Sequence, residues 1–204
     1  MNNAIHKWNE KYADDTLVFG STPNGFLVEE SKRLPKACDI LCVGDGEGRN
    51  GVWLAEQGFD ILSVDGAENG VKKAIKQARL RKVSERFKGL CVDLLQWDWP
   101  ENCYDALVCL HLYFMPEDRP RMHRAMLESL KTKGLIILEV FHPDNVGRGC
   151  GGPPLRELCY SADDLESDFK NADILFLKET EREIAPSSFH NGGFGKVTRM
   201  VAQK

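Results

Sequence analysis

The chain has 204 residues, of which 42% are hydrophobic and 28% are charged. This length suits one domain with a full hydrophobic core and is short for two. The net charge of −4 argues against a nucleic-acid or anionic-membrane surface, because binding to phosphates needs clustered positive charge. The apolar runs are strand-sized, and the first residues lack the apolar stretch of a secretory signal. We therefore expect a cytoplasmic protein with neither a nucleic-acid nor a membrane partner, as a monomer or homodimer.

The seven cysteines are odd in number and contain no C-x-x-C pair. Several fall in expected strands, where a free thiol behaves as a small apolar group. This pattern is typical of a reducing compartment and predicts no metal site.

After a polar, helical opening, Ser21-Thr22-Pro23 predicts the start of a helix that runs from about Asn24 to Leu34 and is ended by Pro35. Short apolar strands then alternate with amphipathic helices. The expected strands are 39–43, 59–64, 90–92, 104–110 and 135–141, and the expected helices are 50–57, 71–82 and 117–130. Such alternation predicts a parallel sheet covered on both faces.

Beyond the fifth strand the pattern changes. Ser161-Ala162-Asp163-Asp164 resembles a capping box that opens one more helix. The apolar segments 174–177 and 197–201 are joined by a polar connection and predict an antiparallel edge hairpin. The expected fold is therefore one doubly wound, Rossmann-like α/β domain over residues 1–204, with a mostly parallel seven-stranded sheet.

A glycine-rich turn follows the first strand directly, with glycines at positions 44, 46 and 48. Ligands of such sheets bind beyond the carboxyl ends of the strands, where glycines allow the backbone to approach closely. Asp65 ends the second strand about 20 residues after the first glycine, where a carboxylate can accept hydrogen bonds from ribose hydroxyls. The two features together predict a nucleotide-containing cofactor.

The residue after the third glycine narrows the choice of cofactor. A dinucleotide fingerprint would have another glycine at this position, where the chain has Arg49, so the spacing favours S-adenosylmethionine. Asp93 follows the third strand, where its carboxylate can accept from an adenine amino group while Leu94 packs on the ring. A simple turn cap is the alternative role for Asp93.

Residues 39–50, Val64-Asp65 and Val92-Asp93-Leu94 are together similar to the class I S-adenosylmethionine-dependent methyltransferases. Segments 19–27, 46–50 and 133–139 resemble the tellurite-resistance-type small-molecule methyltransferases. The resemblance implies a helical cap at 1–36 over the cofactor, with Trp8 and Phe19 near the sulfonium. It further implies a cofactor-binding core at 37–141 and an acceptor-side half at 142–204. The residues expected to contact the cofactor are Trp8, Phe19, Gly44, Asp45, Gly46, Gly48, Arg49, Asp65, Gly66, Asp93, Leu94, Cys109 and His111.

Two positions depart from the family pattern. Cys42 stands where many members have an acidic residue, and Thr132-Lys133-Gly134 replaces the usual Pro-Gly-Gly. The motif used to methylate amino groups of bases is missing after the fourth strand, where Cys109-Leu110-His111-Leu112 stands instead. With the acidic net charge, this predicts a small-molecule acceptor. Soft nucleophiles such as thiols or selenium and tellurium oxyanions need little base assistance.

The candidate catalytic residues lie in the second half of the chain. His190 resembles the histidine that family members place in the acceptor pocket, with Arg199 as an anion-holding partner, although an exposed loop histidine is the alternative. His142 is a further candidate to face the acceptor. The glycine-rich segment 147–154 is either a lid or a plain connection, and His6 and His123 are expected at the surface.

Two other functions are compatible with these motifs. An NAD(P)-dependent oxidoreductase would use the same fold. A non-catalytic S-adenosylmethionine-binding protein would explain Cys42 and the lack of an obvious base.

Overall fold

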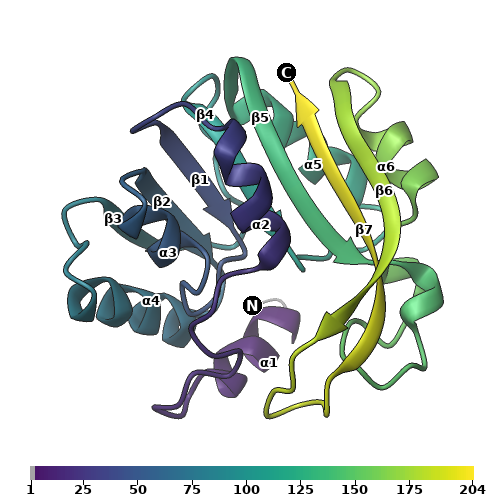
Figure 1. Ribbon diagram of the computed structural model, residues 1–204, viewed down its shortest axis with the longest axis horizontal. Helices are drawn as coiled ribbons and strands as arrows, with labels where there is room; N and C mark the ends of the chain where they lie inside the picture. The colour runs from purple at the N-terminus through teal and green to yellow at the C-terminus, as the bar shows by residue number, and fades with distance from the viewer. Residues whose placement is uncertain (1–2) are drawn as a thin grey trace.

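The computed structural model describes residues 3–204, which form a seven-stranded sheet in the order β3-β2-β1-β4-β5-β7-β6 (Figure 1). The strands are β1 Asp39–Val43, β2 Asp60–Asp65, β3 Phe87–Cys91, β4 Tyr104–Leu110, β5 Leu130–Phe141, β6 Asp173–Ile184 and β7 Gly193–Gln203. The α-helices are α1 Asn3–Lys11, α2 Gly25–Glu30, α3 Gly51–Glu56, α4 Glu68–Leu80, α5 Arg119–Ser129 and α6 Ala162–Asp168. The short 3-10 helices are η1 Ser31–Arg33, η2 Pro143–Asn145 and η3 Arg156–Leu158.

The sheet is parallel except at one edge. β1 pairs in parallel with both β2 and β4, so the strand order reverses beside β1. β7 is antiparallel to β5 and to β6. The predicted fold class is confirmed, including the edge hairpin, although β6 and β7 are much longer than the apolar segments that predicted them. The switch point beside β1 is where such sheets bind their ligands.

Helices cover both faces of the sheet. Successive strand residues point to opposite faces, and both sets are apolar in β1. Ile40 and Cys42 pack with apolar residues of α2, α3 and α4. Leu41 and Val43 pack with apolar residues of α5 and α6 on the other face. In Figure 1, α2 and α3 accordingly lie in front of the sheet and α5 and α6 behind it. Within residues 3–204, no helix combines the length and apolar character needed to cross a membrane.

The start of α2 differs from the prediction. Asn24, and not Ser21 or Thr22, caps the helix, because its side-chain oxygen accepts from the backbone N–H of Phe26 at 2.8 Å and of Leu27 at 3.4 Å. Pro23 therefore precedes the cap instead of occupying the first turn. The predicted helix 24–34 is also shorter, since α2 passes into the 3-10 turn η1. Asparagine is among the strongest capping residues, which explains this boundary.

Two predictions about the second half have opposite outcomes. The capping box at Ser161 is confirmed, with reciprocal hydrogen bonds between Ser161 and Asp164. The prediction that His123 lies at the surface is wrong, because its ring is only 1% exposed. His123 stacks on Phe169 and contacts Asp168, both contributed by the end of α6, with Nδ1 2.8 Å from the Asp168 carboxylate. A buried imidazole needs such a partner.

Candidate cofactor and acceptor site

The glycine turn after β1 has left-handed backbone at all three glycines, with φ of +63° at Gly44, +56° at Gly46 and +80° at Gly48. Space as well as conformation demands glycine here. A Cβ on Gly44 would lie 2.9 Å from the Leu112 side chain, and one on Gly48 would lie 2.7 Å from Cβ of Ala74 in α4. The third glycine therefore lets the turn pack on α4, and the first lets it pack against Leu112.

Asp65 at the end of β2 is held by the turn it faces. Its two carboxylate oxygens accept from the backbone N–H of Gly46 at 2.9 Å and of Ala67 at 2.8 Å. Burial raises the pKa of this carboxyl group, and the backbone donors oppose that rise. Each oxygen still has a lone pair for a ligand hydroxyl. The position therefore suits the ribose of a cofactor.

Asp45 was expected to contact the cofactor, and that contact stays a prediction, while its side chain also bonds within the protein. Its side chain accepts from the Gly51 backbone N–H at 3.2 Å and from the Ser63 hydroxyl at 2.9 Å. Burial raises the pKa of Asp45 to about 7. Asp45 thus ties the turn to α3 and β2 through its side chain.

Asp93 and Leu94 follow β3 as predicted. One Asp93 oxygen accepts from the Leu95 backbone N–H at 3.1 Å, which is the turn-cap arrangement. Leu94 is buried in the apolar cluster that also contains Val64. Asp93 therefore shapes the turn, and an adenine contact by its other oxygen stays a prediction.

Helix α1 packs directly on the glycine turn, where Figure 1 shows it below the ends of the strands. Tyr12, just after α1, is 6% exposed, and a Cβ on Gly46 would lie 2.6 Å from its hydroxyl. Trp8 stacks on Tyr12 with ring centroids 5.5 Å apart and lies 6.0 Å from Phe19. A Cβ on Gly66 would meet Ile5 of the same helix. Tyr12 was not predicted, although it shares the aromatic N-terminal segment with Trp8.

Glu47 fastens this N-terminal segment to the turn. Its buried carboxylate accepts from the Val18 backbone N–H at 2.8 Å and pairs with Lys73 of α4 at 2.8 Å. The same lysine donates to the Thr16 carbonyl at 2.7 Å. The sequence placed Glu47 in the glycine motif but gave no sign of these partners, which lie 26 and 29 residues away.

A second group of polar side chains surrounds Glu139 on β5, which is completely buried. Its carboxylate pairs with Arg199 of β7 at 2.7 Å and Arg182 of β6 at 2.8 Å, and accepts from the Asn24 amide at 2.7 Å. Burial opposes ionisation, but the hydrogen bonds from His111 and Asn24 and the charge of Arg182 hold the pKa of Glu139 well below its usual range. Glu139 is therefore a weak base. Sequence reasoning identified neither Glu139 nor Arg182.

His111 belongs to this group and lies just beyond β4 with a left-handed φ of +58°. Its Nε2 is 3.1 Å from the Glu139 carboxylate, and its Nδ1 is 3.2 Å from the Tyr113 hydroxyl, which accepts from the Phe141 backbone N–H. The tautomer protonated on Nε2 fits this chain, because Tyr113 can then donate to Nδ1. Burial lowers the pKa of His111, so the ring is neutral at pH 7.

The cysteines next to the site are packing residues in this structure. Cys109 is buried in β4, and burial raises the pKa of its thiol to about 12. Cys42 is buried in β1 against the α3 and α4 side of the core, and burial raises the pKa of its thiol well above the usual value. Neither thiol is available as a thiolate nucleophile at neutral pH.

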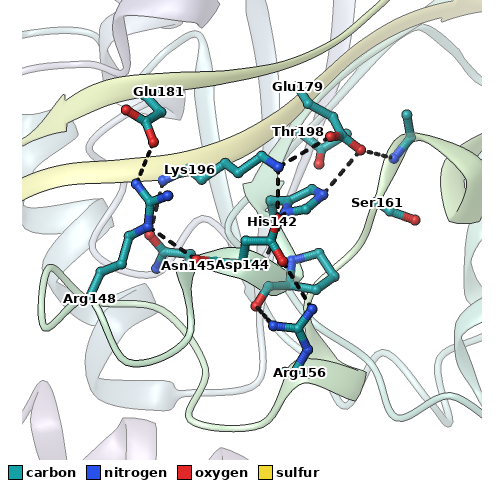
Figure 2. Close-up of polar contacts among 12 residues, drawn as sticks. His142, Asp144, Asn145, Arg148, Arg156, Ser161, Glu179, Glu181, Lys196 and Thr198 are labelled. Carbon is teal, nitrogen blue, oxygen red and sulfur yellow. Dashed lines mark hydrogen bonds and ion pairs between the residues drawn. The ribbon is translucent and has the colours of Figure 1, made fainter.

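His142 lies in a separate ion-pair network, which Figure 2 shows. Its Nδ1 accepts from the Asp144 backbone N–H at 3.0 Å, and its Nε2 is 3.1 Å from the Glu179 carboxylate. Lys196 links Asp144 and Glu179 at 3.0 and 3.5 Å. Both ring nitrogens are thus engaged: Nδ1 caps η2, and Nε2 joins it to the hairpin. The acceptor role of His142 stays a prediction.

His190 and Arg199 are placed in different surroundings. His190 lies at the tip of the β6–β7 hairpin, where Nδ1 accepts from the Gly192 backbone N–H at 3.2 Å and the ring lies over Gly151. Burial lowers the pKa of His190, with a smaller effect from Lys11. Arg199 instead pairs with Glu139 and lies over the Phe26 ring. The glycine-rich segment 147–154 therefore touches His190, but no contact joins His190 to Arg199 among the described residues.

Comparison with known proteins agrees with this geometry. Residues 40–134 match a family described as a methyltransferase domain. A glycine/sarcosine N-methyltransferase of Halorhodospira halochloris is 28% identical over 153 residues, which cover 70% of this chain and 53% of that protein. The human glycine N-methyltransferase is 27% identical over 142 residues, covering 61% of this chain and 48% of that protein. The chain thus spans about half the length of these curated relatives.

A solved structure, TehB from Haemophilus influenzae, superposes with a TM-score of 0.74 at 20% identity, covering 97% of this chain and 65% of that one. This likeness shows the fold. The family match covers β1 to β4 and the start of β5, which are the strands that carry the glycine turn and Asp65. Sheet order, glycine turn and relatives agree: residues 40–134 are similar to a methyltransferase domain, and the chain has the fold of the class I S-adenosylmethionine-dependent methyltransferases.

Proposed function

We propose that the protein transfers a methyl group from S-adenosylmethionine to a small-molecule acceptor. The observation that carries the proposal is the glycine turn with three left-handed glycines facing Asp65. A glycine turn next to a partly buried carboxylate with free lone pairs fits a nucleoside with ribose hydroxyls. The matching family and relatives support the same chemistry.

The cofactor, when bound, supplies an activated methyl group on a sulfonium centre. The chain's own residues then have three tasks. Asp65 and the turn orient the nucleoside, and Tyr12 with Trp8 of α1 covers the turn and excludes water. The Glu139 cluster orients the acceptor on the side of β5, β6 and β7. Such alignment in a water-poor site supplies much of the rate in a displacement reaction.

For the acceptor we favour a soft nucleophile, namely a thiol or a selenium or tellurium oxyanion. The side chains around Glu139 support this choice, because Glu139 is ionised and ion-paired and both His111 nitrogens are engaged. Neither group is a strong base, and soft nucleophiles need little base assistance. His190 and Arg199 are the proposed acceptor-side catalytic residues, and His142 is the third candidate.

A second acceptor class is the amino group of a small amino acid. The names of the relatives, glycine and sarcosine N-methyltransferases, favour it. An amine must reach the sulfonium unprotonated, which would need a base with a free lone pair. Among the candidates, His190 has one ring nitrogen without a hydrogen bond to the described residues.

The test combines thermal unfolding with product analysis. S-adenosylhomocysteine at 100 times its dissociation constant should stabilise the protein by about 2.7 kcal/mol, while NAD(P) should not. A panel of thiols, selenite, tellurite and amines then identifies the methylated product by mass spectrometry. Stabilisation by NAD(P) alone would support the oxidoreductase alternative. Binding of S-adenosylhomocysteine without methylation of any acceptor would support a non-catalytic binding protein.

We also propose a cytoplasmic location. All seven cysteines are free thiols, and Cys91 and Cys103 are exposed. Exposed unpaired thiols are typical of proteins that work in a reducing compartment.

A further inference from the structure

The group of side chains around Glu139 carries more positive than negative charge. Three arginines, Arg49, Arg182 and Arg199, come from the glycine turn, β6 and β7 respectively. Arg182 and Arg199 share the single carboxylate of Glu139. Arg49 makes no ion pair or hydrogen bond within residues 3–204, but its electrostatic neighbours are Arg182, Glu139, Asp45 and Tyr12. The cluster is therefore short of an anion.

The hydrogen bonds of Arg182 show the same deficit. Its terminal nitrogens donate to the Glu183 carbonyl at 3.0 Å and to Glu139 at 2.8 Å, and one of them lies 3.1 Å from Nε2 of His111. Its Nε–H is buried and has no acceptor among the described residues. A buried guanidinium donor without an acceptor is unfavourable, so this atom marks a place for a ligand oxygen.

The pKa of Arg49 fits this picture. Burial lowers it first, and the charge of Arg182 lowers it further. Asp45, which also faces Arg49, has a pKa raised to about 7 by burial and is therefore only partly charged at neutral pH. An added anion would relieve the repulsion between the two guanidinium groups.

We propose that a carboxylate of the methyl acceptor binds between Arg49 and Arg182 and completes this cluster. The proposal rests on the methyltransferase function proposed above. A carboxylate matches the planar fork of a guanidinium and accepts two parallel N–H bonds. Arg49 immediately follows the glycine turn, so an acceptor held there lies beside the cofactor site.

The cofactor's own methionine carboxylate is the other possible source of this chemistry. The placement of Arg182 favours the acceptor. Arg182 belongs to the edge strand β6, whereas Asp65 and Asp93, which suit the nucleoside, end β2 and follow β3 on the opposite side of β1. The arginine pair is thus displaced toward the acceptor-side strands.

The experiment uses calorimetry on full-length protein saturated with S-adenosylhomocysteine. The titrants are glycine, sarcosine and mercaptoacetate, each with its neutral amide, and selenite. Each carboxylate that binds should bind at least about 100-fold more tightly than its amide, an effect of a size expected for a lost charged hydrogen bond. Arg49→Met is the primary variant, because Arg49 pairs with no carboxylate of the protein, and it should abolish the preference for the acid over the amide. Arg182→Lys should reduce this preference. Arg124→Met on the exposed face of α5 is the matched control.

Each remaining result decides against the proposal. Equal binding of acids and amides, or no binding of any carboxylate, would overturn it. Selenite binding alone would assign the arginines to an inorganic oxyanion instead. A loss of affinity for S-adenosylhomocysteine in Arg49→Met, with unchanged affinity for 5′-methylthioadenosine, would assign them to the cofactor's carboxylate. Failure of the parent protein to bind S-adenosylhomocysteine would instead contradict the proposed function itself.

Discussion

At the scale of single residues, the site separates carboxylates that face a ligand from those that hold the chain. Asp65 and Asp45 are both partly buried, and Asp65 accepts from the backbone N–H groups of Gly46 and Ala67. Asp45 uses its oxygens on Ser63 and Gly51. The two residues should therefore respond differently to the same substitution.

Asp65→Asn should weaken binding of S-adenosylhomocysteine by about 10- to 100-fold, because a charged acceptor for hydroxyl donors is lost. Isothermal calorimetry measures the effect. Asp60→Asn, at the exposed start of the same strand, is the matched control and should bind normally. A folded Asp65→Asn protein with unchanged affinity would remove Asp65 from the cofactor site.

His190→Ala should leave cofactor affinity unchanged and slow turnover by about 100-fold, the contribution typical of a positioned acid or base. The measurements are calorimetry for S-adenosylhomocysteine and steady-state kinetics with the acceptor found in the panel. Ser188→Ala in the same exposed connection is the control. Equal turnover of the two variants would mean that His190 is a loop residue without a catalytic role.

At the scale of elements, α1 and the β6–β7 hairpin close the site from opposite ends of the chain. Tyr12, just after the end of α1, packs on Gly46. The Lys11 ammonium lies 4.2 Å from the Trp8 ring centroid and 4.3 Å from that of Phe189 in the hairpin connection. Figure 1 shows both segments below the carboxyl ends of the parallel strands. The cap and the acceptor side therefore meet through a cation between two aromatic rings.

Tyr12→Ala should release α1 from the glycine turn, because it removes the buried ring that contacts Gly46. We expect affinity for S-adenosylhomocysteine to fall by about 10-fold and cleavage by trypsin in the N-terminal segment to become faster, as for a locally destabilised element. Lys7→Ala on the exposed side of α1 is the control. Tighter cofactor binding by Tyr12→Ala would show that α1 obstructs the site instead of covering it.

At the scale of the whole molecule, the glycine turn links stability to pH. The pKa of Asp45 is about 7 in the folded protein and 3.8 as the ordinary value. Since the folded state holds this proton more tightly, Asp45 contributes stability that is fully present below about pH 4 and is lost as the pH rises through 7.

Asp45→Asn removes this titration while keeping one acceptor for Gly51 and one group for Ser63. The unfolding free energy of the parent protein relative to the variant should fall by about 3 kcal/mol between pH 5 and pH 8. Urea unfolding at each pH measures it, with Asp60→Asn as the control. A difference that stays constant over this range would contradict the raised pKa.

Local patterns in the sequence were sufficient for the sheet, the capping box at Ser161 and the glycine turn with Asp65. Each depends on neighbouring residues, through alternation of apolar side chains, a cap three residues from its partner, or glycine at a left-handed position. The same patterns predicted β4 to the residue.

Only the tertiary structure could reveal the Glu139 cluster, the burial of His123 and the seat of Tyr12 on Gly46. Their partners are distant in the chain: Glu139 meets Asn24 across 115 residues, and His123 meets Asp168 across 45. The position of a charged or aromatic residue in the sequence does not reveal whether its side chain faces solvent or a distant partner. Burial is decided when the sheet brings β5, β6 and β7 together. A charge buried there is stable only when it is paired with an opposite charge from the protein or from a ligand.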